Sequence, residues 1–369
     1  MQHYILGDLV DEISERENSP STSKYERFVG LEHYVSGDVE IKNYGSTSKL
    51  NSAMKVFKSG DILVARRNVY LRRASVVYFE GLTSGDSIVL RAKDYAFGKL
   101  LRFILNTSEF WDYAEKHSDG TMSKRLSPKI LKSYEFDLPD SVDIESLAEI
   151  LWSAFDTKEA YTNLLNKTKE LVRAQFMDLF YGHNYPEVTM DSVLVQHTKT
   201  EKITDTLNEK YVTVALHGKG VRERNIETYD PKPFSGYRIK AGQFIYSRID
   251  ARNGALGIVP SELDNAVVSK DFPVFSILED KVLPEVLLFS VLDENFIQQI
   301  QKNSMGTTNR QRIKEEVFLK YTIVLAPIDK QKEFIKFINQ SNVSIQSLTD
   351  SIAKVNGLIK AILYDAINE

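Results

Sequence analysis

The sequence predicts an α+β fold in which two copies of one mixed domain are separated by two long helices that form an antiparallel coiled coil. Three observations lead to this prediction: an internal repeat at offsets of 182 to 188 residues, strands alternating with helices inside each copy, and a long helical pattern after each copy. Solenoid repeats are only about 20–50 residues long, so a repeat of this length indicates a duplicated domain. The expected boundaries are 1–140 and 183–327 for the domains, with 141–182 and 328–369 for the helices.

The repeat is clearest in a segment of seven residues. Gly-Asp-Ile-Leu-Val-Ala-Arg at 60–66 corresponds to Gly-Gln-Phe-Ile-Tyr-Ser-Arg at 242–248, and Val-Val at 76–77 corresponds to Ile-Val at 258–259, all at an offset of 182. The match continues at offsets of 186 to 188 with the pairs Phe103 and Phe289, Gly120 and Gly306, and Pro139 and Pro327. A few loop insertions would produce such a drift, so the duplication covers each domain as a whole.

Each copy is expected to contain short strands followed by a helix. In the first copy, residues 61–65 and 74–78 are rich in β-branched residues and predict buried strands. Residues 97–116 have apolar residues at helical spacing, and 131–138 predict a last strand. The second copy repeats this order, with strands around Phe244 and Ile258, a helix over 284–301 and a strand that ends at Pro327.

Two segments predict long helices. Residues 144–181 contain no Pro or Gly and are rich in good helix formers, whereas 329–367 show apolar or small residues at alternating steps of four and three. The second pattern is a coiled-coil heptad seam. Two amphipathic helices packed on their own domains would also explain these patterns, but so regular a seam favours a helical partner, for which the other long helix is available. The expected seam residues are Leu147, Leu151, Tyr161, Leu165, Ile338, Ile345, Leu348, Ile352, Val355 and Ile359.

Composition excludes several classes of protein. The chain has no cysteine, which rules out disulfides, thiolate metal sites and a cysteine nucleophile. No apolar segment is long enough to span a membrane, and the first residues lack the basic and apolar regions of a signal peptide. We therefore expect a cytoplasmic protein without membrane contact. The net charge of −4 neither favours nor excludes nucleic-acid binding, since a basic face can be offset elsewhere.

No catalytic motif is evident. The six histidines are not at metal-ligand spacing, and no phosphate-binding loop of the Gly-x-x-x-x-Gly-Lys type occurs. Asp-Pro-Lys-Pro-Phe at 230–234 only loosely resembles the (Asn/Asp)-Pro-Pro-aromatic motif of adenine methyltransferases. Asp-Val-Glu-Ile-Lys at 38–42 has the letters of a metal-nuclease motif but no duplicate in the second copy. We expect no catalytic residue, no metal and no cofactor on this chain.

Positive charge is concentrated in the loop that follows the repeated strand. The candidates there are Arg66, Arg67, Tyr70, Arg72 and Arg73 in the first copy and Arg248 and Arg252 in the second. Guanidinium groups bind phosphate oxygens and the O6/N7 edge of guanine in a bidentate manner. A solvated turn would explain any single arginine, but recurrence at 66 and 248 favours a binding role.

Two further groups of basic residues accompany this loop. One follows each Gly-Thr and comprises Lys124 and Arg125 in the first copy and Asn309, Arg310, Gln311 and Arg312 in the second. Asn and Gln bind adenine edges, although the glycines could equally serve only to end a helix, and both roles are compatible. The other group, Lys219, Arg222 and Arg224, occurs in the second copy alone, whereas the first copy has an acidic segment at 33–40. Unequal residues at one position of a duplicated surface suit the reading of two different half-sequences.

In these features the chain resembles the specificity subunit of a type I restriction-modification enzyme. The resemblance is carried by 60–66 and 242–248, by the passages that end in Gly-Thr at 121 and 307, and by the proline and acidic or polar helix start at 327–331. At the corresponding place the first copy has only Pro139-Asp140. A Glu-Gln after the proline is missing from the first copy, and the second copy has Lys-Gln instead. These departures concern the partner contact near each helix start. The resemblance covers essentially the whole chain.

The resemblance implies two target-recognition domains that each bind half of a bipartite double-stranded DNA target, with two helices as the spacer. It implies methyltransferase (modification) subunits as partners, which bind S-adenosylmethionine and methylate adenine, and restriction subunits as further partners. Helices of about 38 residues at ~1.5 Å per residue span roughly 57 Å, about one and a half turns of duplex. The alternative is a non-catalytic coiled-coil scaffold that joins protein partners without binding DNA; a self-sufficient nuclease or methyltransferase is a third reading.

Overall fold

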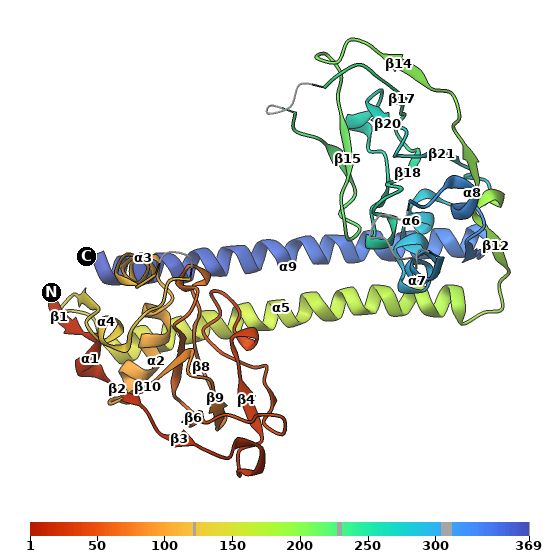
Figure 1. Ribbon diagram of the computed structural model, residues 1–369. Coiled ribbons are helices and arrows are strands. Elements are labelled where there is room, and N and C mark those ends of the chain that lie inside the picture. Colours follow the sequence, from red (N-terminus) through yellow and green to blue (C-terminus); the bar gives the residue numbers. More distant parts are fainter. Residues whose placement is uncertain (121–122, 227–230, 304–311, 369) are drawn as a thin grey trace. The chain divides into compact units, whose positions relative to one another are not determined.

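The computed structural model describes residues 1–120, 123–226, 231–303 and 312–368. The chain divides into two compact units: unit 1 comprises Met1–Leu165 and Ser347–Glu369, and unit 2 comprises Asn166–Gln346. Both boundaries lie inside long helices, namely α5 (Ile144–Tyr181) and α9 (Ile328–Asn368), which are the longest elements in Figure 1. Each unit thus contains one mixed domain and part of both helices.

Unit 1 contains a two-stranded sheet, β1-β11, a four-stranded sheet, β2-β10-β7-β8, and a five-stranded sheet, β3-β6-β9-β4-β5. Its strands are β1 (Gln2–Ile5), β2 (Val10–Ile13), β3 (Arg16–Glu17), β4 (Arg27–Val29), β5 (Gly45–Ser46), β6 (Met54–Phe57), β7 (Ile62–Ala65), β8 (Ala74–Val76), β9 (Gly81–Thr83), β10 (Ser87–Ala92) and β11 (Glu135–Leu138). Its shorter helices are α1 (Leu6–Leu9), α2 (Tyr95–Ile104), α3 (Ser108–His117) and α4 (Pro128–Lys132), with 3-10 turns η1 (Pro20–Thr22), η2 (Leu31–His33) and η3 (Val69–Leu71).

Unit 2 repeats the two-stranded sheet as β12-β22 and the four-stranded sheet as β13-β21-β18-β19, but it has a three-stranded sheet, β14-β17-β20, and a ribbon, β15-β16, in place of the five-stranded one. Its strands are β12 (Glu187–Thr189), β13 (Leu194–Gln196), β14 (Glu201–Ile203), β15 (Val212–Val214), β16 (Val221–Glu223), β17 (Phe234–Arg238), β18 (Phe244–Tyr246), β19 (Leu256–Ile258), β20 (Val267–Ser269), β21 (Val274–Ile277) and β22 (Thr322–Val324). Its helices are α6 (Pro284–Leu292), α7 (Glu294–Asn303) and α8 (Glu315–Phe318), with 3-10 turns η4 (Met190–Ser192), η5 (Ala251–Asn253) and η6 (Ser261–Leu263).

The four-stranded sheets confirm the duplication down to the register. Ile62 pairs with Val76 in unit 1, and Phe244 pairs with Ile258 in unit 2, so both partners keep the offset of 182. The strand order and the antiparallel pairing are also the same in the two sheets. The units therefore share a common frame, to which each adds its own third sheet.

Three expected elements are wrong in detail. The helix expected over 97–116 is two helices, α2 and α3, because Thr107 ends the first by donating to the carbonyl of Ile104 and caps the second through the backbone N–H of Phe110. The helix expected over 284–301 is likewise divided, between α6 and α7 at Asp293. The strand expected from 131 begins only at Glu135, because the residues before it form α4.

The repeated sequence segment is explained by a turn. Gly60 and Gly242 adopt φ angles of +93° and +80°, and the next side chain, Asp61 or Gln243, accepts a hydrogen bond from the backbone N–H three residues earlier at 2.8 Å in both units. Asp61 also receives two hydrogen bonds from Arg91, at 2.7 and 2.8 Å. The glycine allows the left-handed backbone that the turn needs, and the polar side chain closes it.

Replacing Gly60 or Gly242 by alanine is expected to destabilise the protein by about 1–3 kcal/mol, the cost of a left-handed backbone for a residue with a Cβ. No heavy atom lies within 4 Å of the added Cβ at either position, so the effect is conformational alone. Gly357 in α9 is the control, because its Cβ also meets nothing and a helical Gly-to-Ala change should stabilise by roughly 0.5–1 kcal/mol. Urea unfolding measures all three; equal signs would contradict the turn argument.

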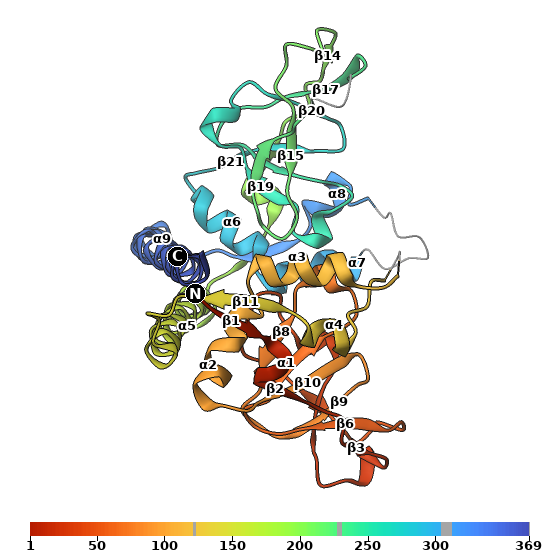
Figure 2. The ribbon, with the colours of Figure 1, turned by 90° about the vertical axis from the view of Figure 1, so that its left-hand side faces the viewer.

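The long helices are antiparallel and share the core of each unit. In unit 1, Leu147 and Leu151 of α5 belong to the same buried cluster as Leu363 of α9. In unit 2, the rings of Phe176 and Phe180 near the end of α5 lie 5.4 and 5.5 Å from that of Phe334 near the start of α9. The start of one helix therefore packs with the end of the other, and the two helices lie side by side in both ribbon views (Figure 2).

The seam expected from the sequence stays a prediction, and its residues are covered to different degrees. Leu147 and Leu151 are buried, and all the other expected seam residues are at least partly covered: Tyr161, Leu165, Ile338, Ile345, Leu348, Ile352, Val355 and Ile359. Between them, Val343 and Leu358 on the outer face of α9 are 72% and 53% exposed. The sequence stripe missed Phe155, Val172, Phe176 and Phe180, which are also buried. Among the described residues no helix is both long enough and apolar enough to cross a membrane.

Candidate nucleic-acid interface

At the end of β7 in unit 1, three segments of the chain meet around Arg66. The backbone N–H of Arg66 donates to the carbonyl of Asp86 at 2.9 Å, and the carbonyl of Arg66 accepts from Leu126 N–H at 2.8 Å. The carboxylate of Asp86 binds the guanidinium of Arg125 at 3.3 Å. These backbone contacts fix the residue after β7, the loop before β10 and the segment after α3 to one another. We call Arg66, Asp86 and Arg125 the arginine corner of unit 1.

Unit 2 contains the same corner. Arg248 N–H donates to the carbonyl of Asp271 at 2.9 Å, and its carbonyl accepts from Ile313 N–H at 2.9 Å. The carboxylate of Asp271 binds Arg312 at 3.3 Å. The equivalent residues are offset by 182, 185 and 187, so the corner is conserved between the units although three separate segments build it. The two outer arginines, Arg125 and Arg312, are 49% and 57% exposed.

The inner arginines differ. Arg248 forms an ion pair with Glu315, and no ion pair of the Arg66 side chain is recorded among the described residues. Burial alone would lower the pKa of Arg248, but the ion pair with Glu315 outweighs it and raises that pKa. The Nε atoms of both inner arginines are buried without an acceptor in the described part of the chain. Arg248 is therefore partly engaged in holding α8, and Arg66 has the greater capacity for an external anion.

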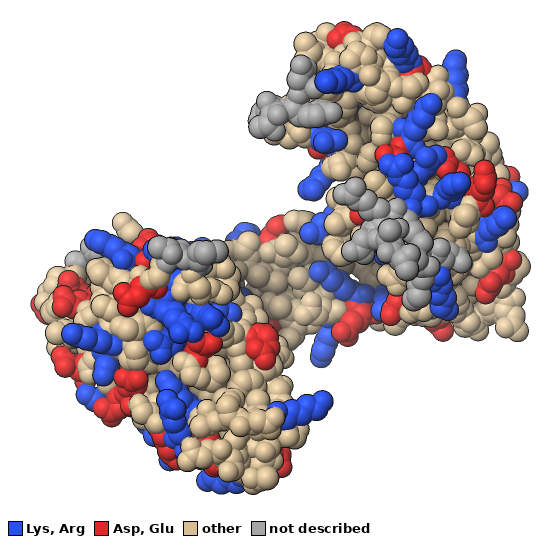
Figure 3. All heavy atoms as spheres, in the orientation of Figure 1, with Lys and Arg blue, Asp and Glu red and all other residues tan. Residues whose placement is uncertain are grey.

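Unit 1 brings its two predicted basic groups together. Arg67, 3.6 Å from the Asp86 carboxylate, forms a backbone bridge with Arg125. Arg72 contacts Asp112 at 2.8 Å, and Lys124 donates to the carbonyl of Glu115 at 2.8 Å. Tyr70 is 61% exposed. These side chains come from the β7–β8 loop and the loop after α3, and Lys and Arg side chains gather on the surface of each unit in Figure 3.

Arg73 is a correction to the sequence prediction. It is 9% exposed, and its guanidinium donates to the carbonyls of Leu31 at 3.0 Å and Arg67 at 3.1 Å. Burial lowers the pKa of Arg73. This arginine ties the basic loop to η2 and does not belong to a binding surface.

Lys219, Arg222 and Arg224 lie on or beside the β15–β16 ribbon and are exposed. The ribbon turns through His217, Gly218 and Gly220, which all have positive φ. Of the other candidates in unit 2, Arg252 is half-buried in η5, whereas Asn309, Arg310 and Gln311 lie outside the described residues.

The ribbon occupies the place of the acidic segment of unit 1. Gly218 N–H donates to the carbonyl of Gly254 at 3.0 Å, and Gly37 N–H donates to that of Arg72 at 3.4 Å. Arg72 and Gly254 are equivalent at the offset of 182, and both have positive φ, 49° and 73°. The unlike segments predicted to correspond therefore lie at equivalent positions beside the arginine-bearing loop.

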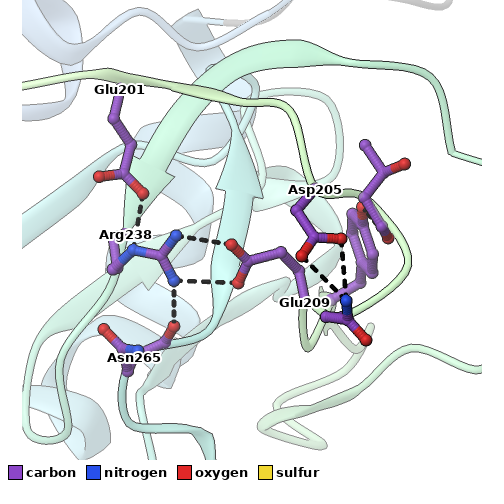
Figure 4. A network of polar contacts seen from close by, with 8 residues as sticks. Glu201, Asp205, Glu209, Arg238 and Asn265 are labelled. Atoms are coloured by element: carbon purple, nitrogen blue, oxygen red, sulfur yellow. Dashed lines mark hydrogen bonds and ion pairs between the residues drawn. The ribbon is translucent and has the colours of Figure 1, made fainter.

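A second network fixes the loop that precedes this ribbon (Figure 4). The guanidinium of Arg238 on β17 binds both oxygens of Glu209, at 2.7 and 2.9 Å, and also Glu201 on β14 at 2.6 Å. It donates further to the carbonyl of Asn265 at 2.9 Å. The hydrogen bond to Glu209, outweighing burial, raises the pKa of Arg238. Asp205, labelled in Figure 4, accepts a hydrogen bond from the side-chain amide of Asn208 at 2.9 Å.

Sequence reasoning missed Asp86 and Asp271, the carboxylates that orient the outer arginines. Their offset of 185 lies between the offsets of the flanking matches, 182 and 186, and could have revealed them. In the ranges that the structure describes, no group of three or more His, Asp or Glu side chains is arranged to hold a metal ion.

Comparisons with known proteins show the fold. A scan against protein-family models gives no match, and neither does a search of curated proteins. The chain is similar to the S subunit of a type I restriction-modification system from M. genitalium, with 11% identity, a TM-score of 0.57 and coverage of 100% of this chain and 96% of that one. It is also similar to a chain from a study of complex assembly and conformational transition of the type I R-M system, with 14% identity, a TM-score of 0.53 and coverage of 99% and 97%. The chain thus has the fold of these subunits over its whole length.

Proposed function

We propose that this chain is the specificity subunit of a type I restriction-modification system, which binds a bipartite double-stranded DNA target and directs partner subunits to it. The observation that carries the proposal is the duplicated arginine corner. Each unit has the same three residues, in the same backbone frame, with a different segment beside them. The shared fold with an S subunit supports this reading.

The corners suit a phosphate backbone. Arg125 and Arg312 are about half exposed and are each held by one carboxylate at 3.3 Å. Exposed ion pairs of this kind are worth only about 0–1 kcal/mol, so a phosphate can replace the aspartate as the partner at little cost. The carboxylate keeps the guanidinium oriented in the free protein. Residues common to both units would bind the backbone, which carries no sequence information.

Recognition of the DNA sequence would depend on the segments that differ between the two units. The β15–β16 ribbon of unit 2 presents Lys219, Arg222 and Arg224, and a two-stranded ribbon fits the major groove of duplex DNA. The equivalent place in unit 1 is occupied by the acidic 33–40 segment. Two different DNA-binding segments would recognise two different half-sites.

Partner subunits would dock on the long helices. Both helices expose apolar side chains away from the seam, such as Ile150, Leu171 and Val343, at 54%, 55% and 72% exposure. Methyltransferase subunits, with S-adenosylmethionine bound to them, would supply the chemistry, and restriction subunits would join the assembly. The chain itself would need no cofactor. It would act in the cytoplasm, a reducing compartment that suits a cysteine-free chain and contains the DNA target.

DNA binding in the presence of the methyltransferase partner, compared at low and high salt, tests the proposal. In cells that carry this chain and its partner, mapping of methylated adenines should show a bipartite site. A coiled-coil scaffold would bind the partner and leave the methylation pattern independent of this chain. Methylation or cleavage by the purified chain alone, with Mg²⁺ and S-adenosylmethionine, would instead assign it an enzymatic role.

Insertion of one heptad into both α5 and α9, next to Leu165 and Gln346, is expected to lengthen the gap between the half-sites. Seven residues add about 10 Å of helix at ~1.5 Å per residue, which corresponds to about three base pairs. The half-site sequences should stay the same, because neither mixed domain is altered. Mapping of methylated adenines measures both quantities. A changed half-site sequence together with an unchanged gap would contradict the spacer model.

A further inference from the structure

Unit 2 contains a pocket of about 590 Å³, and Arg224 is the one residue of the ribbon contacts proposed above that lines it. Its walls come from Tyr211 before β15, from the start of β17 and from the β20–β21 connection. Asp271 lines it and is also the carboxylate of the arginine corner. The pocket therefore lies directly beside the surface proposed to bind DNA.

One wall of the pocket is aromatic. Phe234 and Tyr211 line it, with ring centroids 6.2 Å apart and planes tilted by 38°. The ring of Phe234 lies across Gly236 on the same strand, where a Cβ would come within 2.6 Å of Cε2. The carbonyl oxygen of Val268 would lie closer still, at 2.2 Å, so the glycine is needed for the approach of β20 as well as for the ring. Phe234 is thus held as a platform on β17, and Phe272 lines the pocket as well.

The rim is basic. Lys232 and Lys270 line the pocket and are exposed, and no ion pair of either lysine is recorded among the described residues. Arg224 also lines it. Asp271 also lines the pocket and forms an ion pair with Arg312 at 3.3 Å. An aromatic wall beside two exposed lysines suits a ligand that has a flat ring and an anionic group.

The pocket is built before any ligand arrives. Tyr211 follows Glu209, which Arg238 holds with two hydrogen bonds (Figure 4). The carbonyl of Tyr211 accepts from Arg224 N–H at 2.8 Å, and Val267 N–H donates to the carbonyl of Lys210 at 2.9 Å. Backbone contacts therefore fix both the aromatic wall and the strand opposite it. Little ordering would be needed on binding, which favours affinity.

We propose that this pocket binds one nucleotide unit, with the base stacked on Phe234 and the phosphate between Lys232 and Lys270. Its volume falls in the usual range for small-ligand sites, about 300–1,000 Å³. Stacking on an aromatic ring accepts any base, and lysine provides a point charge for the phosphate. The same chemistry is available from two sources, a free nucleotide and a base that leaves the stack of the bound DNA. The second source rests on the proposed function; the first does not.

The free source is tested by calorimetric titration of the full chain with each deoxynucleoside 5′-monophosphate. Phe234→Leu keeps an apolar side chain and removes the ring, and it should weaken binding about tenfold, the scale of one stacked base. Lys270→Gln should weaken the nucleotide more than the nucleoside that lacks the phosphate. Lys240→Gln is the matched control, because Lys240 is exposed in the same unit but does not line the pocket. It should change nothing.

The DNA source is tested with the full chain and its methyltransferase partner on a target duplex selected from a random pool. Each adenine of the unit 2 half-site is replaced in turn by 2-aminopurine, whose fluorescence rises when it leaves the stack. One position should brighten with the wild-type chain and stay dark with Phe234→Leu. The methyltransferase flips its own target adenine, and that signal should persist in the variant.

The outcomes separate the two proposals. A nucleotide that binds and is sensitive to Phe234→Leu supports the pocket even if no duplex is bound, in which case the proposed function fails alone. Bound duplex with no Phe234-dependent fluorescence, together with no binding of any free nucleotide, overturns the pocket and leaves the proposed function standing.

Discussion

Replacing Arg125 and Arg312 together by glutamine is expected to weaken DNA binding by at least about 30-fold at moderate salt. One arginine contact of this kind is worth roughly 1–3 kcal/mol, and the two sites lie in separate units, so the losses should add. If both arginines bind phosphates, the dependence of log K on log salt should lose about two units of slope. If one binds a base, the affinity should fall without a matching loss of slope, and specificity should relax at one position of one half-site.

Arg173→Gln is the control for this experiment. Arg173 is 57% exposed, as Arg312 is, and pairs with Glu294 at 2.8 Å, but it lies on α5 outside the arginine corners. Its replacement should leave affinity and salt slope unchanged. An equal loss in the control would show that general charge, and not the corners, governs binding. Unchanged affinity in the double variant would exclude the corners as contacts.

Replacing Phe334 by alanine is expected to destabilise unit 2 by about 3–5 kcal/mol, the usual cost of removing a buried phenylalanine ring. Phe334 is 0% exposed, and its ring lies 5.1–5.5 Å from those of Phe176, Phe180 and Phe289. The cavity would lie where both long helices meet the mixed domain. Both tryptophans, Trp111 and Trp152, belong to unit 1, so their fluorescence reports that unit separately.

Val343→Ala provides the comparison on the same helix. Val343 is 72% exposed, and a surface substitution there should change stability by about 0.5 kcal/mol or less. Urea unfolding followed by circular dichroism should show an early transition for Phe334→Ala alone. If tryptophan fluorescence shifted by the same amount, unfolding would be one cooperative event across both units. A shift in neither signal would mean that the cluster tolerates the cavity.

The frame of this fold could be predicted because periodic and repeated signals survive in the sequence. The matched strands at 62–65 and 244–246 keep one offset, and the heptad seam of α9 extends over more than four heptads. Helix breaks could not be predicted, because they depend on single polar groups such as Thr107, whose side chain bonds two backbone groups at once. The third sheet of each unit could not be predicted either, because the two units differ in the strands that form it.

From the sequence, the candidate site was predicted as a set of basic and polar residues, without the contacts that join them. Recurrence marked Arg66 and Arg248 but did not reveal the aspartates that join them to the distant Arg125 and Arg312. Such contacts link segments about 20–65 residues apart, and no local pattern encodes them. Arg73 was assigned wrongly because clustering in sequence says nothing of burial. Arg72, with φ of 49°, turns the chain sharply between exposed and buried positions.

The division of the units inside the helices has a consequence for synthesis. Unit 1 uses the first 165 residues and also the segment from Ser347 onward, whereas unit 2 is one continuous stretch. A ribosome makes the N-terminal domain first, yet Leu363 can join the core of that domain only after all of unit 2 has been made. Unit 2 can therefore finish folding before unit 1, although it emerges later. A nascent chain that stops after Gln346 would lack Leu363 and the part of α9 that belongs to unit 1, so early termination would remove part of the core of the earliest-made half.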